Sequence, residues 1–193
     1  MMKRLLKAKH WQLFLLTFGI PMLFQFVMLG TIIFQISTNS TPGPESFFTI
    51  VKVFPFLMLL FVGIMMGWFW AVAIELGKKI PENVSLKTSK FKVFFTFPLV
   101  YVFIFLTFFL TIIEGAASNT APEFWIFAII FPLHFFCMFC MFYCLYFVAK
   151  TFKTVELQRK VTFADFAGEF FLIWFYPIGI WIIQPKINRM IES

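Results

Sequence analysis

Residues able to bind a soft metal ion gather in one apolar stretch of the sequence, residues 124–149. On a helix, His134, Cys137 and Cys144 fall on one stripe, and Cys140 lies close to it. Imidazole and thiolate groups are ligands that Cu(I) or Zn(II) prefers, so the pattern predicts a metal site. The alternative is ordinary helix packing, because free cysteines behave as small apolar residues and no Cys-x-x-Cys pair on a second helix completes a four-ligand site.

His134 is also an ionisable side chain near the middle of its apolar stretch. Counting about 1.5 Å per residue along the predicted helices places Gln25 and Tyr101 within a turn or two of the same depth. A cluster of these groups would line a small cavity, since ionisable residues at such depth are costly and often functional. The alternative is a neutral imidazole that hydrogen-bonds to Gln25 or Tyr101 and holds two helices together.

Small residues in another apolar stretch predict close helix packing. Gly63 and Gly67 form a Gly-x-x-x-Gly pattern, in which the missing side chains allow a second helix to approach the backbone. The pattern fits a helix of the same chain and a helix of a partner equally well.

Two carboxylates, Asp165 and Glu169, lie one helical turn apart shortly before the last apolar stretch. Such a pair is able to do acid/base chemistry or to bind a cation. Arg159 and Lys160 are near enough in the sequence to make the pair part of a solvated charge network instead. The chain contains no nucleophile elbow, phosphate loop or His-Glu-x-x-His motif, so we expect no enzymatic activity and no cofactor.

The elements that position these residues must be membrane helices, because the composition excludes a water-soluble fold. Of the 193 residues, 61% are hydrophobic and 13% are charged, whereas soluble domains carry about 25% charged residues. The apolar residues form four long blocks, each able to cross about 30 Å of hydrocarbon. Lipid offers no partner for backbone polar groups, and nothing alternates like a barrel strand, so each block is predicted to be an α-helix.

The sequence thus predicts an all-α membrane protein with four transmembrane helices. The predicted spans are residues 11–36, 47–76, 93–113 and 124–149, which form a transmembrane domain over residues 1–149. Basic residues precede the first span, as they precede the apolar region of a signal peptide. The span has no small-residue cleavage site, so we expect it to remain as an anchor.

The Lys and Arg residues predict the orientation of these spans. All 16 of them except Lys52 lie before the first span, between the second and third, or after the fourth. Cytoplasmic loops of membrane proteins carry such an excess of basic residues, so both termini are predicted to face the cytoplasm. The formal net charge of +7 therefore predicts contact with the headgroups of the lipid bilayer rather than with nucleic acid.

The residues after the fourth span, 150–193, predict a membrane-associated segment that does not cross. Its first part, residues 150–169, is predicted to be a cytoplasmic amphipathic linker with its basic residues toward anionic headgroups. The apolar run that follows, residues 170–183, is too short for a straight span and is interrupted by Pro177 and Gly179. The pattern fits a re-entrant segment and an interfacial helical segment alike.

The stretch from Phe163 to Asn188, FADFAGEFFLIWFYPIGIWIIQPKIN, resembles the C-terminal signature of small multi-pass membrane proteins of unassigned function from Bacteroidota. The resemblance implies a bacterial inner membrane. It implies no activity, no cofactor and no site residue.

Two functions remain open on the sequence. The first is a non-enzymatic membrane subunit or scaffold, which packs through its aromatic residues and the Gly63/Gly67 face against another membrane protein or a second copy. The second is a small transporter or channel, selective for a soft metal ion and lined by the stripe of His134, Cys137 and Cys144.

Overall fold

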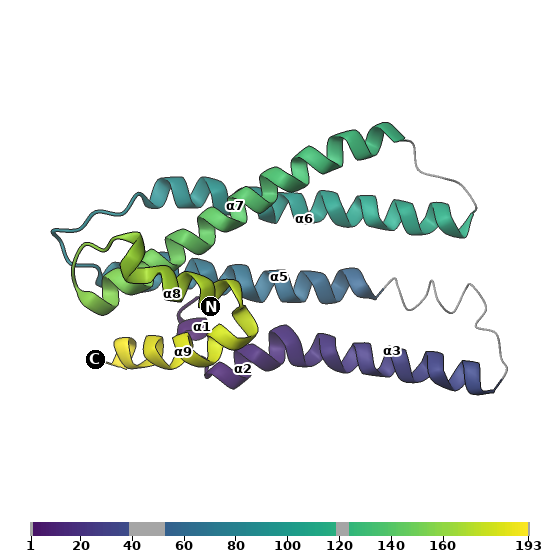
Figure 1. The fold of residues 1–193 in the computed structure, drawn as a ribbon, viewed down its shortest axis with the longest axis horizontal. Helices are drawn as coiled ribbons and strands as arrows, with labels where there is room; N and C mark the ends of the chain where they lie inside the picture. Colours follow the sequence, from purple (N-terminus) through teal and green to yellow (C-terminus); the bar gives the residue numbers. More distant parts are fainter. Residues whose placement is uncertain (1, 39–52, 119–123, 193) are drawn as a thin grey trace.

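The structure is a computed structural model. It describes residues 2–38, 53–118 and 124–192. These residues form helices joined by short connections, and no strand occurs among them. Four of the described helices are long and apolar enough to cross a membrane. The predicted all-α membrane architecture with four spans is therefore confirmed at this level, and Figure 1 shows the four helices lying side by side.

Each of the four long helices matches one predicted span. The first is formed by α2 (His10–Phe14), a π-helical turn η1 (Leu15–Gly19) and α3 (Ile20–Ser37). The second is α5 (Phe54–Trp70), continued by η2 (Ala71–Glu75) and η3 (Leu76–Lys79). The third and fourth are α6 (Thr88–Ala117) and α7 (Phe124–Leu157). Pro98 and Pro132 lie inside α6 and α7 without ending them, as membrane helices tolerate.

A helix extends beyond its predicted span where residues after the apolar run are still buried against neighbouring helices. The predicted boundary at residue 149 falls inside α7, because Phe152 and Thr154 are fully buried and extend the packed face of the helix. Residues 47–52 of the second predicted span, including Lys52, lie outside the described residues.

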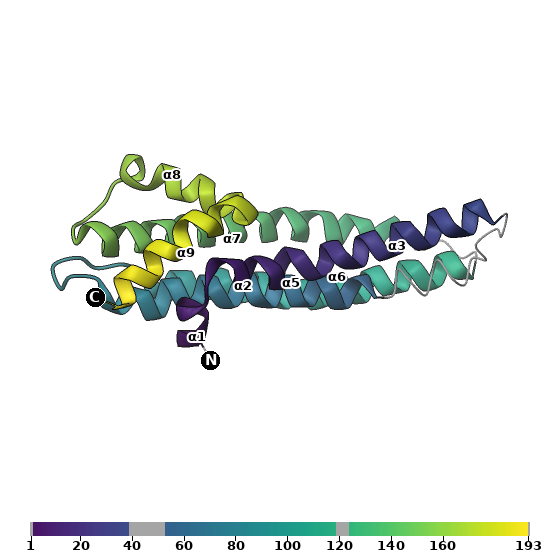
Figure 2. The same ribbon diagram turned by 90° about the horizontal axis from the view of Figure 1, so that it is seen from below.

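The segment after α7 is a helical hairpin. The chain leaves α7 at Gln158, whose φ of 51° ends the helix, and α8 (Phe163–Trp174) and α9 (Tyr176–Glu192) follow. The residues predicted as an amphipathic linker, 150–169, are divided between two helices, since the first part continues α7 and the last part belongs to α8. Figures 1 and 2 show α8 running toward the middle of the bundle and α9 returning beside it.

A glycine makes the hairpin possible. A Cβ atom on Gly179 would overlap the backbone carbonyl of Leu172, so α9 crosses α8 with backbone against backbone. Pro177 stands at the second position of α9, where its missing N–H needs no partner. The two residues that interrupt the apolar run in the sequence thus mark the start of a second helix.

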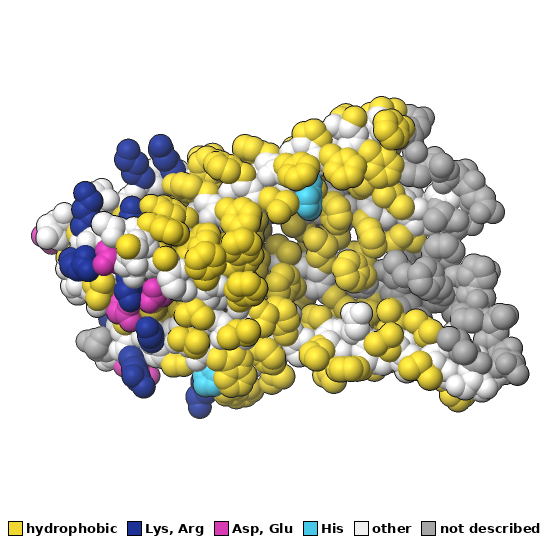
Figure 3. All heavy atoms as spheres, viewed as in Figure 1, with side chains coloured by type: hydrophobic (Ala, Val, Ile, Leu, Met, Phe, Trp, Pro, Cys, Tyr) yellow, Lys and Arg dark blue, Asp and Glu magenta, His cyan; other side chains and the backbone are white. Residues whose placement is uncertain are grey.

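The ends of the bundle differ in charge and in packing. We call the end that holds α1 (Met2–Lys7), α2, α8 and α9 the charged half, and the opposite end the distal half. Figure 3 shows the Lys, Arg, Asp and Glu side chains of the visible face gathered at the charged half. The main cluster of buried apolar residues begins at Met66 on α5 and at Cys144 on α7, so it also lies in the charged half.

The distal half has little core of its own. No described side chain of α3 is buried, and Leu23, Phe26 and Val27 are each at least 60% exposed. Of the most apolar 18-residue stretch in each span, only 11% is buried in the first span and 6% in the fourth. The four spans therefore cover one another mainly near the charged half.

Candidate functional site

A tyrosine and a histidine meet near the middle of two adjacent spans. The hydroxyl of Tyr101 on α6 lies 2.9 Å from Nδ1 of His134 on α7, within hydrogen-bond distance. Tyr101 is 4% exposed, whereas His134 lies on an exposed face of α7. None of the described residues hydrogen-bonds to the other ring nitrogen of His134. The contact between helices that the sequence predicted is present, with Tyr101 as the partner.

The predicted metal ligands do not converge. Cys137, Cys140 and Cys144 are buried free thiols, whereas His134 is on the exposed face and is bound to Tyr101. Among the described residues, no three His, Cys, Asp or Glu side chains are placed to hold a metal ion. Helical spacing alone does not bring His134, Cys137 and Cys144 to one point, so the metal site stays a prediction.

Gln25, the third polar residue predicted at this depth, is placed elsewhere. Its side chain lines an apolar cavity between α3, α5 and α6, and it hydrogen-bonds to neither Tyr101 nor His134. The predicted polar cluster of Gln25, Tyr101 and His134 is thus divided between a hydrogen-bonded pair on α6 and α7 and a single amide on α3.

The two glycines of α5 have different surroundings. A Cβ atom on Gly67 would lie 3.1 Å from Cδ1 of Leu5, so this position packs against α1. A Cβ atom on Gly63 would meet no atom within 4 Å. Only Gly67 serves packing within the described chain, and the Gly63 position is open.

A buried glutamine on α9 joins three segments of the charged half. Gln184 is fully buried, and its Nε2 donates hydrogen bonds to the carbonyl oxygens of Leu6 and Ala8, each at 2.8 Å. Its Oε1 accepts a hydrogen bond of 2.7 Å from the indole N–H of Trp68 on α5. These carbonyls lie at the end of α1, where helical partners run out, so Gln184 caps α1 and holds it against α5.

Sequence analysis did not single out Gln184. The available signal is an amide directly after an apolar run. A polar residue at that point indicates only the end of a membrane-associated segment. Its partners at residues 6, 8 and 68 are known only from the tertiary structure.

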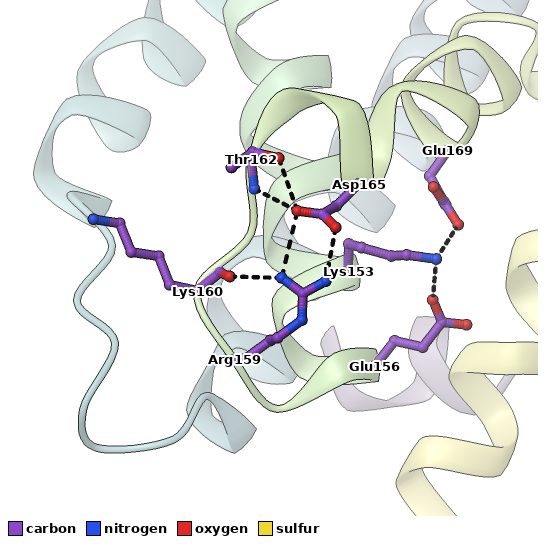
Figure 4. Close-up of polar contacts among 7 residues, drawn as sticks. All are labelled: Lys153, Glu156, Arg159, Lys160, Thr162, Asp165 and Glu169. Atoms are coloured by element: carbon purple, nitrogen blue, oxygen red, sulfur yellow. Dashed lines mark hydrogen bonds and ion pairs between the residues drawn. The ribbon is translucent and has the colours of Figure 1, made fainter.

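The two carboxylates of α8 belong to two separate groups of ion pairs, drawn in Figure 4. Nζ of Lys153 lies 2.8 Å from Oε1 of Glu169 and 2.7 Å from Oε2 of Glu156. Nζ of Lys186 lies 3.3 Å from Oε1 of Glu156. These contacts tie α7 to α8 and to α9, so Glu169 is a structural ion-pair partner.

Asp165 caps the start of α8. Its Oδ1 accepts a hydrogen bond of 2.7 Å from Nη2 of Arg159, and its Oδ2 accepts one of 2.7 Å from the backbone N–H of Thr162 (Figure 4). The hydrogen bonds from Arg159 and then from Thr162 hold the pKa of the Asp165 carboxyl well below its usual range. This carboxylate is ionised, and both of its oxygens accept hydrogen bonds. The contacts of Asp165 and Glu169 therefore favour a structural charge network over acid/base chemistry.

Comparison with known proteins returns no relative: no family model, no curated protein and no solved structure matches the chain. The conclusions on function therefore follow from the residues and their arrangement.

Proposed function

We propose that the protein is a non-enzymatic subunit or scaffold of a bacterial inner membrane, which packs through the exposed face of α7 against a helix of another membrane protein or of a second copy. The observation that carries the proposal is the exposed imidazole of His134 in the middle of the least buried span. Polar side chains at such depth are costly when they face lipid, and helix partners commonly satisfy them.

The surroundings of His134 support a helix as the occupant of this face. Phe131, Phe135 and Phe139 are 60%, 67% and 58% exposed on the same helix. Aromatic side chains are enriched at protein interfaces, where they supply large contact areas. The open position at Gly63 on α5 would admit a close helix in the same way.

The proposed orientation places the charged half at the cytoplasmic side, with both termini there. The distribution of Lys and Arg supports this orientation, and the resemblance to Bacteroidota proteins supports the inner membrane. In this orientation the α8–α9 hairpin enters the inner leaflet without crossing it. Exposed Trp174, Phe175 and Ile178 at its turn support insertion of the hairpin into lipid.

Photo-crosslinking in intact membranes tests the proposal. A photoreactive amino acid replaces Phe135 on the α7 face, and in a separate variant it replaces Leu23 on α3, which is exposed to the same degree at 66%. We expect a discrete protein adduct from position 135 and lipid adducts alone from position 23. His134→Phe is then added to the first variant. It should lower the adduct yield about threefold or more, since the proposed hydrogen bond from His134 to the partner helix is lost.

The crosslinked species also identifies the partner. An adduct of twice the mass of the chain indicates a second copy, and any other discrete mass indicates a different membrane protein. The proposal is wrong if position 135 gives only lipid adducts, or if His134→Phe leaves the yield of the protein adduct unchanged.

A further inference from the structure

The distal half contains an apolar cavity of about 560 Å³ between α3, α5 and α6. Along the first span its lining extends from Thr17 in η1 to Met28 in α3, which corresponds to about 16 Å at about 1.5 Å per residue. That length is about half of the roughly 30 Å of bilayer hydrocarbon. The lining residues belong to helices that are able to span a membrane, so in a bilayer the length of the cavity would match about one leaflet.

Phenylalanine rings dominate the walls of the cavity. They come from all three helices: Phe18, Phe24, Phe54, Phe61 and Phe109. The rings of Phe18 and Phe61 meet edge to face with centroids 5.5 Å apart, and those of Phe54 and Phe109 are 5.8 Å apart. Aromatic walls of this kind favour a planar ring, which they contact by stacking or by edge-to-face packing.

One polar group in the lining has no partner among the described residues. The hydroxyl of Thr17 donates a 2.7 Å hydrogen bond to the carbonyl oxygen of Leu13, so it is satisfied. None of the described residues hydrogen-bonds to the amide of Gln25, which lies near the middle of its span. An amide left without a partner in hydrocarbon is unfavourable, so the occupant should supply a hydrogen-bonding group at this depth.

These requirements decide between the lipids that could enter. A phospholipid acyl chain would fill the volume, but its ester and phosphate groups stay at the membrane surface and offer nothing to Gln25. A neutral lipid with a small head can bring a carbonyl group into the hydrocarbon. We propose that the cavity binds a lipid of the isoprenoid quinone class, with the Gln25 amide donating a hydrogen bond to a ring carbonyl oxygen and the phenylalanine rings enclosing the quinone ring.

The proposal is tested with the full chain in nanodiscs of one phosphatidylcholine, to which ubiquinone-2 is added. Quinone bound per chain is measured by native mass spectrometry, with quinone-loaded nanodiscs without protein as the background. We expect one quinone per chain, and about a tenfold lower affinity for Gln25→Leu, since one hydrogen bond in an apolar site is lost. Gln35→Leu makes the same exchange on α3 outside the cavity lining and should bind quinone like the parent chain.

Two further arms identify the occupant. Met58→Trp places a large side chain into the cavity lining and should abolish quinone binding. Dioleoylglycerol, a neutral lipid without a planar ring, should not compete with the quinone.

The proposal fails if quinone binding does not exceed the background, or if Gln25→Leu binds as well as Gln35→Leu. Retention of phosphatidylcholine in place of quinone, or equal binding of dioleoylglycerol, also overturns it. Because Gln25 is exposed and Leu is a good helix former, Gln25→Leu should fold, and elution of a monodisperse protein confirms this before binding is measured.

Discussion

Gly67 and Gly63 lie one turn apart on α5, yet a methyl group added at Gly67 would meet Leu5, and one added at Gly63 would meet nothing. The same difference in packing, from covered to open helix surface, distinguishes the charged half from the distal half. In the charged half, α1, α8 and α9 cover the long helices and join them through Gln184 and the ion pairs of Lys153. In the distal half, the same long helices continue without covering elements, and α3 buries no described side chain.

Under the functions proposed above, this difference would separate stability from recognition. Lipid tails are as apolar as the side chains they meet, so burial of apolar surface adds little to association of spans within the bilayer. Directed hydrogen bonds and ion pairs hold the charged half together. The distal half keeps its exposed rings and its cavity available for other molecules.

Exchange of a glutamine in each half should give the largest contrast. Gln184→Leu would leave two carbonyl oxygens and the indole N–H of Trp68 buried without partners, so we expect a loss of about 3 kcal/mol in the free energy of unfolding. Gln35→Leu on α3 should change that free energy by less than about 0.5 kcal/mol. Unfolding of both variants in mixed micelles measures the two values, and equal values would show that the halves do not differ as described.

A glycine in each half gives a second, smaller contrast. Gly179→Ala forces a Cβ atom into the carbonyl of Leu172, so α8 and α9 must separate, and we expect a loss of about 2 kcal/mol. Gly63→Ala meets open space and should be neutral or stabilising by up to about 1 kcal/mol, because alanine favours the helix. Limited proteolysis of the hairpin, together with unfolding in mixed micelles, measures both effects. A fully protected hairpin in Gly179→Ala would contradict the close approach of α8 and α9.

Acid should loosen the charged half locally and leave the distal half unchanged. Because the folded-state pKa of Asp165 is depressed, its ionised carboxylate stabilises the start of α8 above its ordinary pKa of 3.8, and this stabilisation is lost as the pH falls through the lower folded-state value. We expect exchange protection of the backbone amides in the first turn of α8 to decrease below about pH 4, relative to their intrinsic exchange rates. Amides of α3, which has no acidic residue, serve as the reference.

Asp165→Asn provides the control for this prediction. It removes the charge that pairs with Arg159 but keeps an oxygen that can accept from the backbone N–H of Thr162. Protection of the first turn should then be lower at pH 7 and should no longer depend on pH in the acid range. An unchanged pH dependence would assign the effect to a different group.

The long helices were predictable because the bilayer fixes their length and their backbone hydrogen bonding. Residues 11–36 and 93–113 were both recognised from length and hydrophobicity, and the structure extends the third span to Thr88–Ala117. The helix ends were less predictable, since the continuation of α7 through Phe152 depends on residues that pack against it from α8, η2 and η3.

Whether a site residue could be predicted depends on how far away in the sequence its partners lie. Depth along the helices gave Gln25 and Tyr101 as candidate partners of His134, and the hydrogen bond is made by Tyr101, because its helix is the one that packs beside α7. His134, Cys137 and Cys144 are not brought together as a group among the described residues, because a helical stripe fixes the direction of side chains on one helix and supplies no ligand from another. Gln184 was missed because its partners are far away in the sequence and include backbone atoms, which have no residue pattern.

The hydrogen bonds of Gln184 also set an order of events during synthesis. Its partner carbonyl at Leu6 is 178 residues earlier in the chain. At about 5 to 20 residues per second, α1 waits roughly 10 to 35 seconds on the ribosome before the residue that caps it is made. During that interval the four spans can already enter the membrane. The charged half is therefore completed last, and a chain truncated before residue 184 would have all four spans but no cap on α1.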